Sequence, residues 1–290
     1  MSLIKDTLKR ILSVQRRSQL KKTKRRLISF FKRGGRNKVS LKEFEAILRE
    51  DIGLKKGDKI FVTSSFGNLN ADFSPTEAIK LLMKIVTGEG VIMMPYYPPM
   101  NSNEWAKRSN TFDMRSTKSG MGVVTNLFSK MPGVQRSIHP VKSVCVWGKD
   151  VKSIIEGHEK AETPFYWDSP YGKFLKMGCS TLGLGVTNNP IFHAIEDVLS
   201  QPKTKYYEKN KYTLRLITDK NKEIEVETYI HDANIISKCI STGEYIKTLN
   251  CNSYKKIKFG HSFIYNINNS EVLEKLKIVV ANGNDKLRQR

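Results

Sequence analysis

The 290-residue sequence has few of the residues on which disulfide-stabilised and metal-stapled proteins depend. It contains four cysteines, and the closest two, Cys239 and Cys251, are too far apart for the paired ligands of a zinc knuckle. We therefore expect neither a disulfide scaffold nor a structural metal cluster. The chain also opens without an apolar signal sequence, which favours a reducing, cytoplasmic location.

Long uncharged apolar stretches are also missing. No segment approaches the roughly 18 apolar residues that a membrane-spanning helix needs. With 39% hydrophobic and 9% aromatic residues, the chain can still bury a core, so the composition argues against global disorder.

The common nucleotide-binding and hydrolase motifs are incomplete. Gly183 and Gly185 follow a strand pattern, but the third glycine of a dinucleotide fingerprint would fall at Asn188. The glycines at 88 and 90 are not followed by the lysine of a phosphate-binding loop, and the segment 63–67 lacks the first glycine of a nucleophile elbow. These three classes of site are not expected.

Acidic residues are scarce relative to basic ones. The 28 Asp and Glu face 50 Lys and Arg, which gives a net charge of +22. Residues 1–40 hold 14 of the basic residues and one acid, so the remaining 250 residues carry only +9. The sequence thus divides into a strongly basic arm and a mildly basic body.

The arm, residues 1–37, mixes apolar residues near helical spacing with clusters of Lys and Arg, and Gly34-Gly35 interrupts any helix. Such a segment suits a peripheral helix on an anionic membrane. A solvated extension accounts for it equally simply, and nucleic acid, which attracts the same charges, is the least favoured partner. All three interpretations stay open.

The body begins with a strand–helix–strand pattern. A capping box at Ser40–Glu43 predicts a helix through about Asp51, and 59–62 is typical of a strand. A second capping signal at Ser74–Glu77 predicts a helix that precedes a buried strand at 91–95. This order predicts an α/β layered fold.

Further helices are predicted at 122–131, 149–157, 190–199, 233–241 and 270–281, with strands at 143–147 and 181–186 and a hairpin formed by 212–218 and 223–230.

One pair of residues has the chemistry of a general base. His193 and Glu196 lie three residues apart on a predicted helix, hence on one face. A carboxylate that holds one imidazole nitrogen fixes the tautomer and raises the basicity of the other nitrogen. An ordinary pair on a helix surface has the same spacing, so the residues alone do not decide between the two.

A second dense group is Arg136-Ser137-Ile138-His139-Pro140, followed by Ser143. An arginine, two hydroxyls and a histidine between a helix and a strand suit a phosphate or a carboxylate. A surface ion pair and a turn explain the same residues equally well.

Taken in order, several segments resemble the aminoglycoside 3-N-acetyltransferase family, over about residues 40–281. The similarity rests on six landmarks in the order of that family: Gly57-Asp58 leading to Ser64-Ser65, Gly90–Pro95, Phe112-Asp113 with Ser119–Gly122, Arg136–Pro140, Ser169-Pro170, and Leu184-Gly185-Val186 leading to His193-x-x-Glu196.

The resemblance implies an α/β protein, a layered αβα sandwich with a mixed central sheet and a strand-rich C-terminal part. It implies two regions, the basic arm 1–37 and a catalytic domain 38–290, and direct transfer of acetyl from acetyl-CoA to an amine, without a metal. The implied site residues are His193 as the base and Glu196 as its partner, with Ser64, Ser65, Arg136, Ser137, His139 and Ser143 on the acetyl-CoA side and Asp168 and Asn189 on the acceptor side.

The acceptor stays open at this point. The family makes aminoglycosides, and hence antibiotic resistance, the default. A basic body favours an anionic nucleotide-linked or lipid-linked amino sugar of surface-polysaccharide synthesis instead. The non-enzymatic alternative is a membrane- or nucleic-acid-binding protein with an inactive acetyltransferase fold. A homodimer is left open, and we expect His231 and His261 to be structural or exposed.

Overall fold

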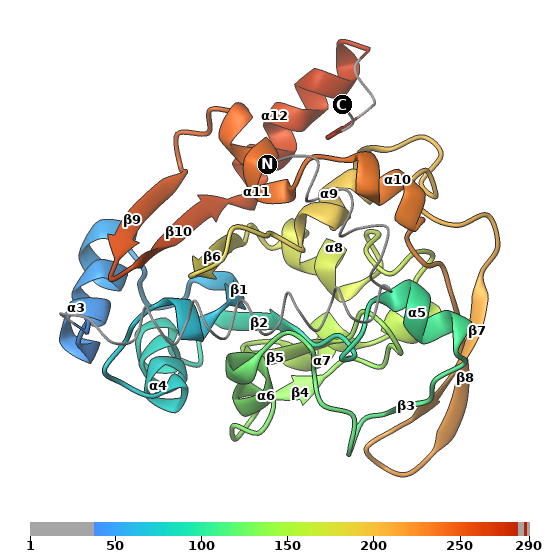
Figure 1. Cartoon of the computed structure of the whole chain (residues 1–290), viewed down its shortest axis with the longest axis horizontal. Coiled ribbons are helices and arrows are strands. Elements are labelled where there is room, and N and C mark those ends of the chain that lie inside the picture. Colours follow the sequence, from blue (N-terminus) through green and yellow to red (C-terminus); the bar gives the residue numbers. More distant parts are fainter. Residues whose placement is uncertain (1–37, 284–286, 289–290) are drawn as a thin grey trace, which may run out of the picture.

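The computed structural model describes residues 38–283 and 287–288, so the arm expected over residues 1–37 lies outside the described residues. A seven-stranded sheet forms the centre, in the order β4-β5-β2-β1-β6-β10-β9 (Figure 1). β1 runs parallel to β2 and β6, whereas β5 and β10 run antiparallel to their neighbours. The strands are β1 (Lys59–Ser64), β2 (Val91–Pro95), β4 (Gln135–Arg136), β5 (Val144–Gly148), β6 (Ser180–Leu184), β9 (Lys255–Phe259) and β10 (Ser262–Asn268).

The first elements form where the local sequence predicts them. Ser40 caps α3 (Leu41–Ala46) and Ser74 caps α4 (Pro75–Val86), each in a reciprocal capping box. α3 continues as a π-helical segment, Ile47–Ile52. β1, α4 and β2 then make the predicted parallel unit.

Alternating side chains of the strands feed two separate cores. In β1, Ile60 and Val62 point to one core and Phe61 to the other. Residues of α3, α4 and α6 (Val123–Phe128) complete the first core, and residues of α7 (Val151–Ile155), α8 (Pro170–Lys176), α9 (Phe192–Leu199) and α12 (Asn269–Ala281) complete the second. The expected αβα sandwich with a mixed central sheet is confirmed.

A smaller sheet lies beside this sandwich (Figure 1). The predicted hairpin forms β7 (Tyr212–Ile217) and β8 (Glu223–Thr228), and β3 (Phe112–Asp113) pairs with β7. Asn221 takes the positive φ of the turn, +62°. The helices α5 (Ser102–Lys107), α10 (Ala233–Lys238) and α11 (Thr242–Thr248) connect the two parts.

Some elements were not predicted. β9 and β10 form a hairpin that extends the main sheet beyond β6. Three lysines in β9 hide the strand pattern, and β9 is an edge strand, where charged side chains discourage pairing with other chains. The helices α5, α8 and α11 were also missed, and α6 ends at Phe128, short of the predicted Met131.

Within residues 38–283 and 287–288, no helix has both the length and the apolar character needed to cross a bilayer.

Candidate active site

Several segments singled out in the sequence meet at one edge of the main sheet. The parallel strands β1, β2 and β6 end there, followed by Ser65, by Tyr96 and Tyr97, and by the loop 185–190. The loop 137–143 returns to the same edge, because Val144 of β5 pairs with Pro95 of β2. In open α/β sheets, ligands bind outside the carboxyl ends of the parallel strands.

The loop after β6 is held firmly above β1. The backbone oxygen of Asn188 accepts hydrogen bonds from Thr63 Oγ1 (3.3 Å) and from Tyr265 Oη (3.1 Å). Gly183 makes room for Tyr265, since a Cβ at Gly183 would lie 1.9 Å from the tyrosine ring. Gly185 has a φ of +70°, which favours glycine. The two glycines of the incomplete fingerprint therefore shape the loop that leads to α9.

His193 and Glu196 form a hydrogen-bonded pair in α9. His193 Nδ1 lies 2.7 Å from Glu196 Oε2. Glu196 is 1% exposed, whereas 20% of the His193 side chain remains accessible. The pair is therefore anchored in the interior while its ring reaches the surface of the sheet edge.

Electrostatics fix the protonation state of this pair. Burial alone would raise the pKa of Glu196, but the hydrogen bond from His193 and the charges of His193 and Arg288 outweigh it, so the pKa is lowered. Burial lowers the pKa of His193, and Glu196 only partly offsets this. An ionised Glu196 accepts the Nδ1 proton of a neutral His193, which leaves Nε2 with a free lone pair.

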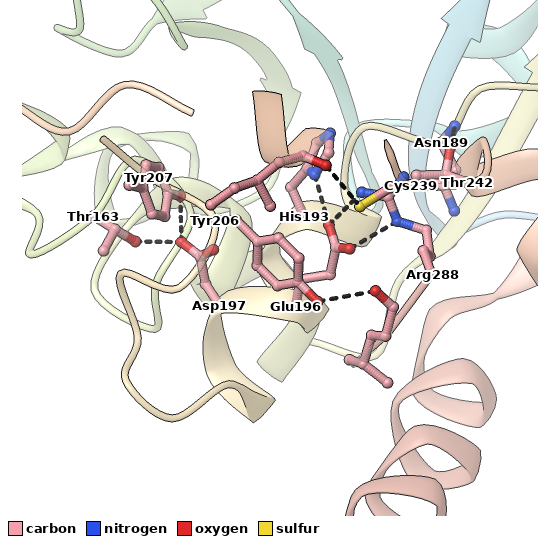
Figure 2. A network of polar contacts seen from close by, with 12 residues as sticks. Thr163, Asn189, His193, Glu196, Asp197, Tyr206, Tyr207, Cys239, Thr242 and Arg288 are labelled. Atoms are coloured by element: carbon pink, nitrogen blue, oxygen red, sulfur yellow. Dashed lines mark hydrogen bonds and ion pairs between the residues drawn. The ribbon is translucent and has the colours of Figure 1, made fainter. Parts of the chain in front are cut away.

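Arg288 completes this arrangement (Figure 2). Its Nε and Nη2 lie 2.7 Å and 2.9 Å from the two oxygens of Glu196. No motif in the sequence pointed to Arg288, because it lies 92 positions from its partner.

His231 packs directly on His193. Its ring centre lies 4.6 Å from that of His193 and 5.4 Å from Phe165, with which it stacks at 9°. His231 is 9% exposed, so of the two expected alternatives, structural or exposed, it is not the exposed one. Burial, with the nearby His193 and Lys142, lowers the pKa of His231 well below its usual value. His261 is exposed, as expected.

Figure 2 shows Asp197 with its two hydrogen-bond partners, Thr163 and Tyr207. Its Oδ2 accepts hydrogen bonds from the hydroxyls of Thr163 and Tyr207, the latter at 2.5 Å. Tyr207 in turn stacks on His231 at 4.6 Å. Burial raises the pKa of Asp197 well above its usual value.

Lys142 brings a cation to the site. Its Nζ lies 4.6 Å above the ring of Tyr97 and 5.7 Å from that of Phe165. Burial lowers its pKa to about 8. The Phe165 ring centre lies 5.4 Å from those of both His193 and His231, so the ammonium group is close to the two histidines, and it lowers the pKa of each. Among the described residues, no carboxylate forms an ion pair with Lys142.

Three residues expected on the acetyl-CoA side have internal partners. Ser137 Oγ bonds to His158 Nδ1 (2.8 Å), and Ser143 Oγ donates to the Ser137 carbonyl (2.6 Å). His139 Nδ1 accepts from the backbone N–H groups of Val141 and Lys142. All three residues are at most 2% exposed, so their side chains organise the loop 137–143.

The other three lie nearer the surface. Arg136 is half-buried, with its guanidinium 4.9 Å from the centre of the Tyr96 ring. Ser65 is partly exposed. Ser64 Oγ is a buried hydroxyl without a hydrogen-bond partner among the described residues, which makes it available to a ligand.

The two residues expected on the acceptor side are not brought together with His193 by any contact in the described chain. Asp168 is exposed, and its Oδ2 accepts from the backbone N–H of Glu162. Asn189 is fully buried, and its side chain faces Thr181 and Asn269.

The described part of the chain contains no group of three or more His, Cys, Asp and Glu residues able to hold a metal ion. All four cysteines are free thiols.

Comparison with known proteins supplies the context for this geometry. The family described as aminoglycoside 3-N-acetyltransferase matches residues 61–279. A Bacillus subtilis strain 168 relative, the SPbeta prophage-derived aminoglycoside N(3')-acetyltransferase-like protein YokD, is 30% identical over 165 residues. That alignment covers 50% of this chain and 60% of the relative, so the match spans less than two thirds of the relative's length.

Solved structures share the fold at low sequence identity. AAC-IIIb in its binary complex with CoASH has a TM-score of 0.68 and 16% identity, covering 85% of this chain and 98% of that one. AAC-VIa bound to sisomicin has a TM-score of 0.67 and 18% identity, covering 85% and 99%.

Proposed function

Because the chain belongs to the aminoglycoside 3-N-acetyltransferase family, we propose that it transfers the acetyl group of acetyl-CoA to an amine of an amino sugar, with His193 as the general base. The observation that carries this proposal is the buried, ionised Glu196 at 2.7 Å from His193 Nδ1. It leaves Nε2 of a partly accessible ring at the carboxyl edge of the sheet.

The transfer is a direct displacement at the thioester. The amine nitrogen attacks the acetyl carbon, a C–N bond forms, and the C–S bond breaks as the CoA thiolate leaves. His193 Nε2 accepts the proton that the attacking nitrogen loses, and the resulting imidazolium can return it to the thiolate. Glu196 stabilises the imidazolium and holds the ring in place.

The oxyanion formed during attack needs donors. We propose the Ser64 hydroxyl, because it is buried at the end of β1 and has no partner in the described protein. Neighbouring backbone N–H groups, and the Ser65 hydroxyl, are further donors at the same strand end.

For acetyl-CoA itself, we propose Arg136 as the cation that meets a phosphate, with Ser65 nearby. Ser137, His139 and Ser143 would contribute indirectly by holding the loop 137–143 in shape. The complex of AAC-IIIb with CoASH, a protein of the same fold, supports a CoA-type donor.

The first candidate for the acceptor is an aminoglycoside. The family and the sisomicin complex of AAC-VIa support it. Asp168 is an exposed carboxylate that can meet a cationic amine, whereas Asn189 would act by holding the loop before α9, since its side chain is buried.

A second candidate, an anionic amino sugar linked to a nucleotide or a lipid, is favoured by Lys142. This cation faces the space around His193, and no carboxylate of the described chain neutralises it. The nearby acids are already committed, Glu196 to Arg288 and Asp197 to two hydroxyls. Such a site attracts an anion more readily than a polycation.

We also propose a cytoplasmic enzyme whose residues 1–37 touch an anionic membrane surface. The net charge and the apolar residues of this arm support the proposal. Salt-sensitive binding of the whole chain to anionic liposomes, lost when residues 1–37 are removed, tests it. A homodimer is tested by the mass in solution.

One screen tests the function and separates the acceptors. Release of free CoA is followed with a thiol reagent while tobramycin and a dTDP-linked amino sugar are offered in turn. We expect release of free CoA with one of the two acceptor classes. Thiol release with neither, while liposomes or DNA bind the arm, would favour the non-enzymatic alternative.

A further inference from the structure

Arg288 reaches Glu196 from beyond α12, and its neighbours hold it there. Leu287 is 1% exposed, and its carbonyl accepts a hydrogen bond from Tyr206 Oη at 3.0 Å. Arg288 and Ile240 exchange two hydrogen bonds, Nη1 to the Ile240 carbonyl (2.7 Å) and Ile240 N to the Arg288 carbonyl (2.9 Å). Three hydrogen bonds of this segment therefore hold the guanidinium against the carboxylate.

The Arg288–Glu196 ion pair differs from an exposed ion pair in its burial and in its number of contacts. Arg288 is 4% exposed, and it contacts both oxygens of Glu196. Arg49 and Glu45, by contrast, meet through one contact, with 43% and 33% of their side chains exposed. Burying two charges costs free energy that only good geometry offsets. A buried bidentate pair is therefore, by itself, weak evidence that the pair stabilises the fold. Arg288 also holds a φ of +58°, which a non-glycine residue rarely adopts.

We propose that Arg288 is a positioning residue for the general base: it fixes the Glu196 carboxylate so that His193 keeps its Nδ1 proton toward Glu196 and presents Nε2 to the acceptor amine. This inference rests on the proposed function. Arg288 itself touches no reacting atom. It acts through Glu196, whose Oε2 is shared between His193 Nδ1 and Arg288 Nη2.

The charges around the pair determine what removal of Arg288 would do. The groups that act on His193 or Glu196 are Lys142, Asp197, Tyr206, Tyr207, His231, Cys239, Tyr245 and Arg288. Lys142 and Arg288 are the two cationic side chains of this set, and both lower the pKa of His193. Without Arg288, the full charge of Glu196 acts on His193 alone, so the pKa of His193 rises.

The test compares the whole wild-type chain with Arg288→Ala. We expect kcat to fall about tenfold to a hundredfold, because a loosely held base is misplaced by a fraction of an ångström or more. We also expect the acid limb of the kcat/KM profile to move to higher pH. Guanidinium ion at millimolar concentration should restore part of the rate, whereas urea at the same concentration should not. Arg49→Ala, the matched exposed pair, should change neither quantity.

A second readout needs no substrate. The nitrogen chemical shifts of His193, followed by NMR as the pH is varied, should give a higher pKa in Arg288→Ala than in wild type. In a Glu196→Gln background, Arg288→Ala should add little to the loss of kcat, because the two residues act as one unit.

Each outcome of these experiments either supports or overturns the proposed role of Arg288. Unchanged kcat, pH profile and NMR titration in a folded Arg288→Ala would overturn it. If circular dichroism shows that Arg288→Ala does not fold, Arg288→Lys is measured in its place. A folded Arg288→Lys with wild-type kinetics and a wild-type His193 titration would overturn the proposal, because Arg288 would then contribute only to stability. If the wild-type chain were inactive on every acceptor, the proposed function would be wrong. The NMR titration would still test whether Arg288 controls the pKa of His193.

Discussion

α9 and the chain beyond β8 contribute to the same site in opposite ways. α9 supplies both members of the acid–base pair within three residues, at a spacing that any helix brings together. The later chain supplies His231, whose ring centre lies 4.6 Å from that of His193, and Arg288, bound to the Glu196 carboxylate. Neither residue has a local pattern that points to chemistry.

The comparison separates the residues proposed to transfer a proton from those proposed to adjust the orientation and charge of that pair. Under the proposed function, the pair in α9 would provide the group that moves a proton, whereas the distant residues would set its orientation and its charge. If this division is correct, changes in α9 should have the largest effects on rate, and changes outside it should alter pH dependence, affinity or stability instead.

Replacing the base should have the largest effect. His193→Gln removes the proton acceptor, and we expect kcat to fall by about 10²–10⁴, the usual contribution of a general base. The fold should survive, because the ring is partly accessible and glutamine fits the same helix position. Thiol release by the purified variant, with its circular dichroism spectrum as control, measures this. Full turnover would assign the base elsewhere.

Glu196→Gln should lower kcat by less, about a hundredfold, because the base remains but is no longer held in position by the carboxylate. The pH effect has a defined sign. Glu196 raises the pKa of His193, so its loss lowers that pKa and moves the acid limb of kcat/KM to lower pH. Arg288→Ala is expected to move the limb the other way, so a shared direction in the two variants would contradict the charge arrangement described here.

Lys142→Met tests the acceptor, with an expected effect of about tenfold on KM, as for one lost charged contact. If the acceptor is anionic, its KM should rise in this variant while the KM of acetyl-CoA changes little. The wild-type KM should also rise above pH 8, because the lysine, whose pKa is about 8, loses its charge there. The variant should lose this dependence. An aminoglycoside acceptor would leave its KM unchanged or lower it.

Much of the fold follows from local sequence signals. The two serine capping boxes, the parallel β1-α4-β2 unit and the β7–β8 hairpin form where predicted, because caps, turn residues and apolar periodicity act over a few residues. β9 and β10 were not predicted, because the three lysines of β9 hide its strand pattern and β10 joins the main sheet through β6, which lies far earlier in the sequence.

The residues of the candidate site likewise divide into those that local sequence signals indicate and those that they do not. His193 and Glu196 were found from their spacing, and the αβα fold from the resemblance. Ser137, His139 and Ser143 were expected to meet the cofactor, but composition does not tell a hydroxyl that faces a ligand from one that faces another side chain. Lys142, His231 and Arg288 are placed by contacts that only the folded chain makes.

His231→Phe should have the smallest effect on rate, within about threefold in kcat. The ring is neutral because burial depresses its pKa, and its Nε2 has no hydrogen-bond partner among the described residues. Phenylalanine keeps the stacking on Phe165 and Tyr207 and removes a buried polar atom that costs roughly 1–3 kcal/mol when left without a partner.

Urea unfolding should therefore show the stability of His231→Phe unchanged or raised by about 1 kcal/mol, whereas His231→Ala, which leaves a cavity, should lose about 2 kcal/mol. A loss of kcat in His231→Phe as large as that in His193→Gln would place Nε2 of His231 on a reacting group. The division between a chemical pair in α9 and a supporting shell from the later chain would then fail, because both regions would supply groups that move protons.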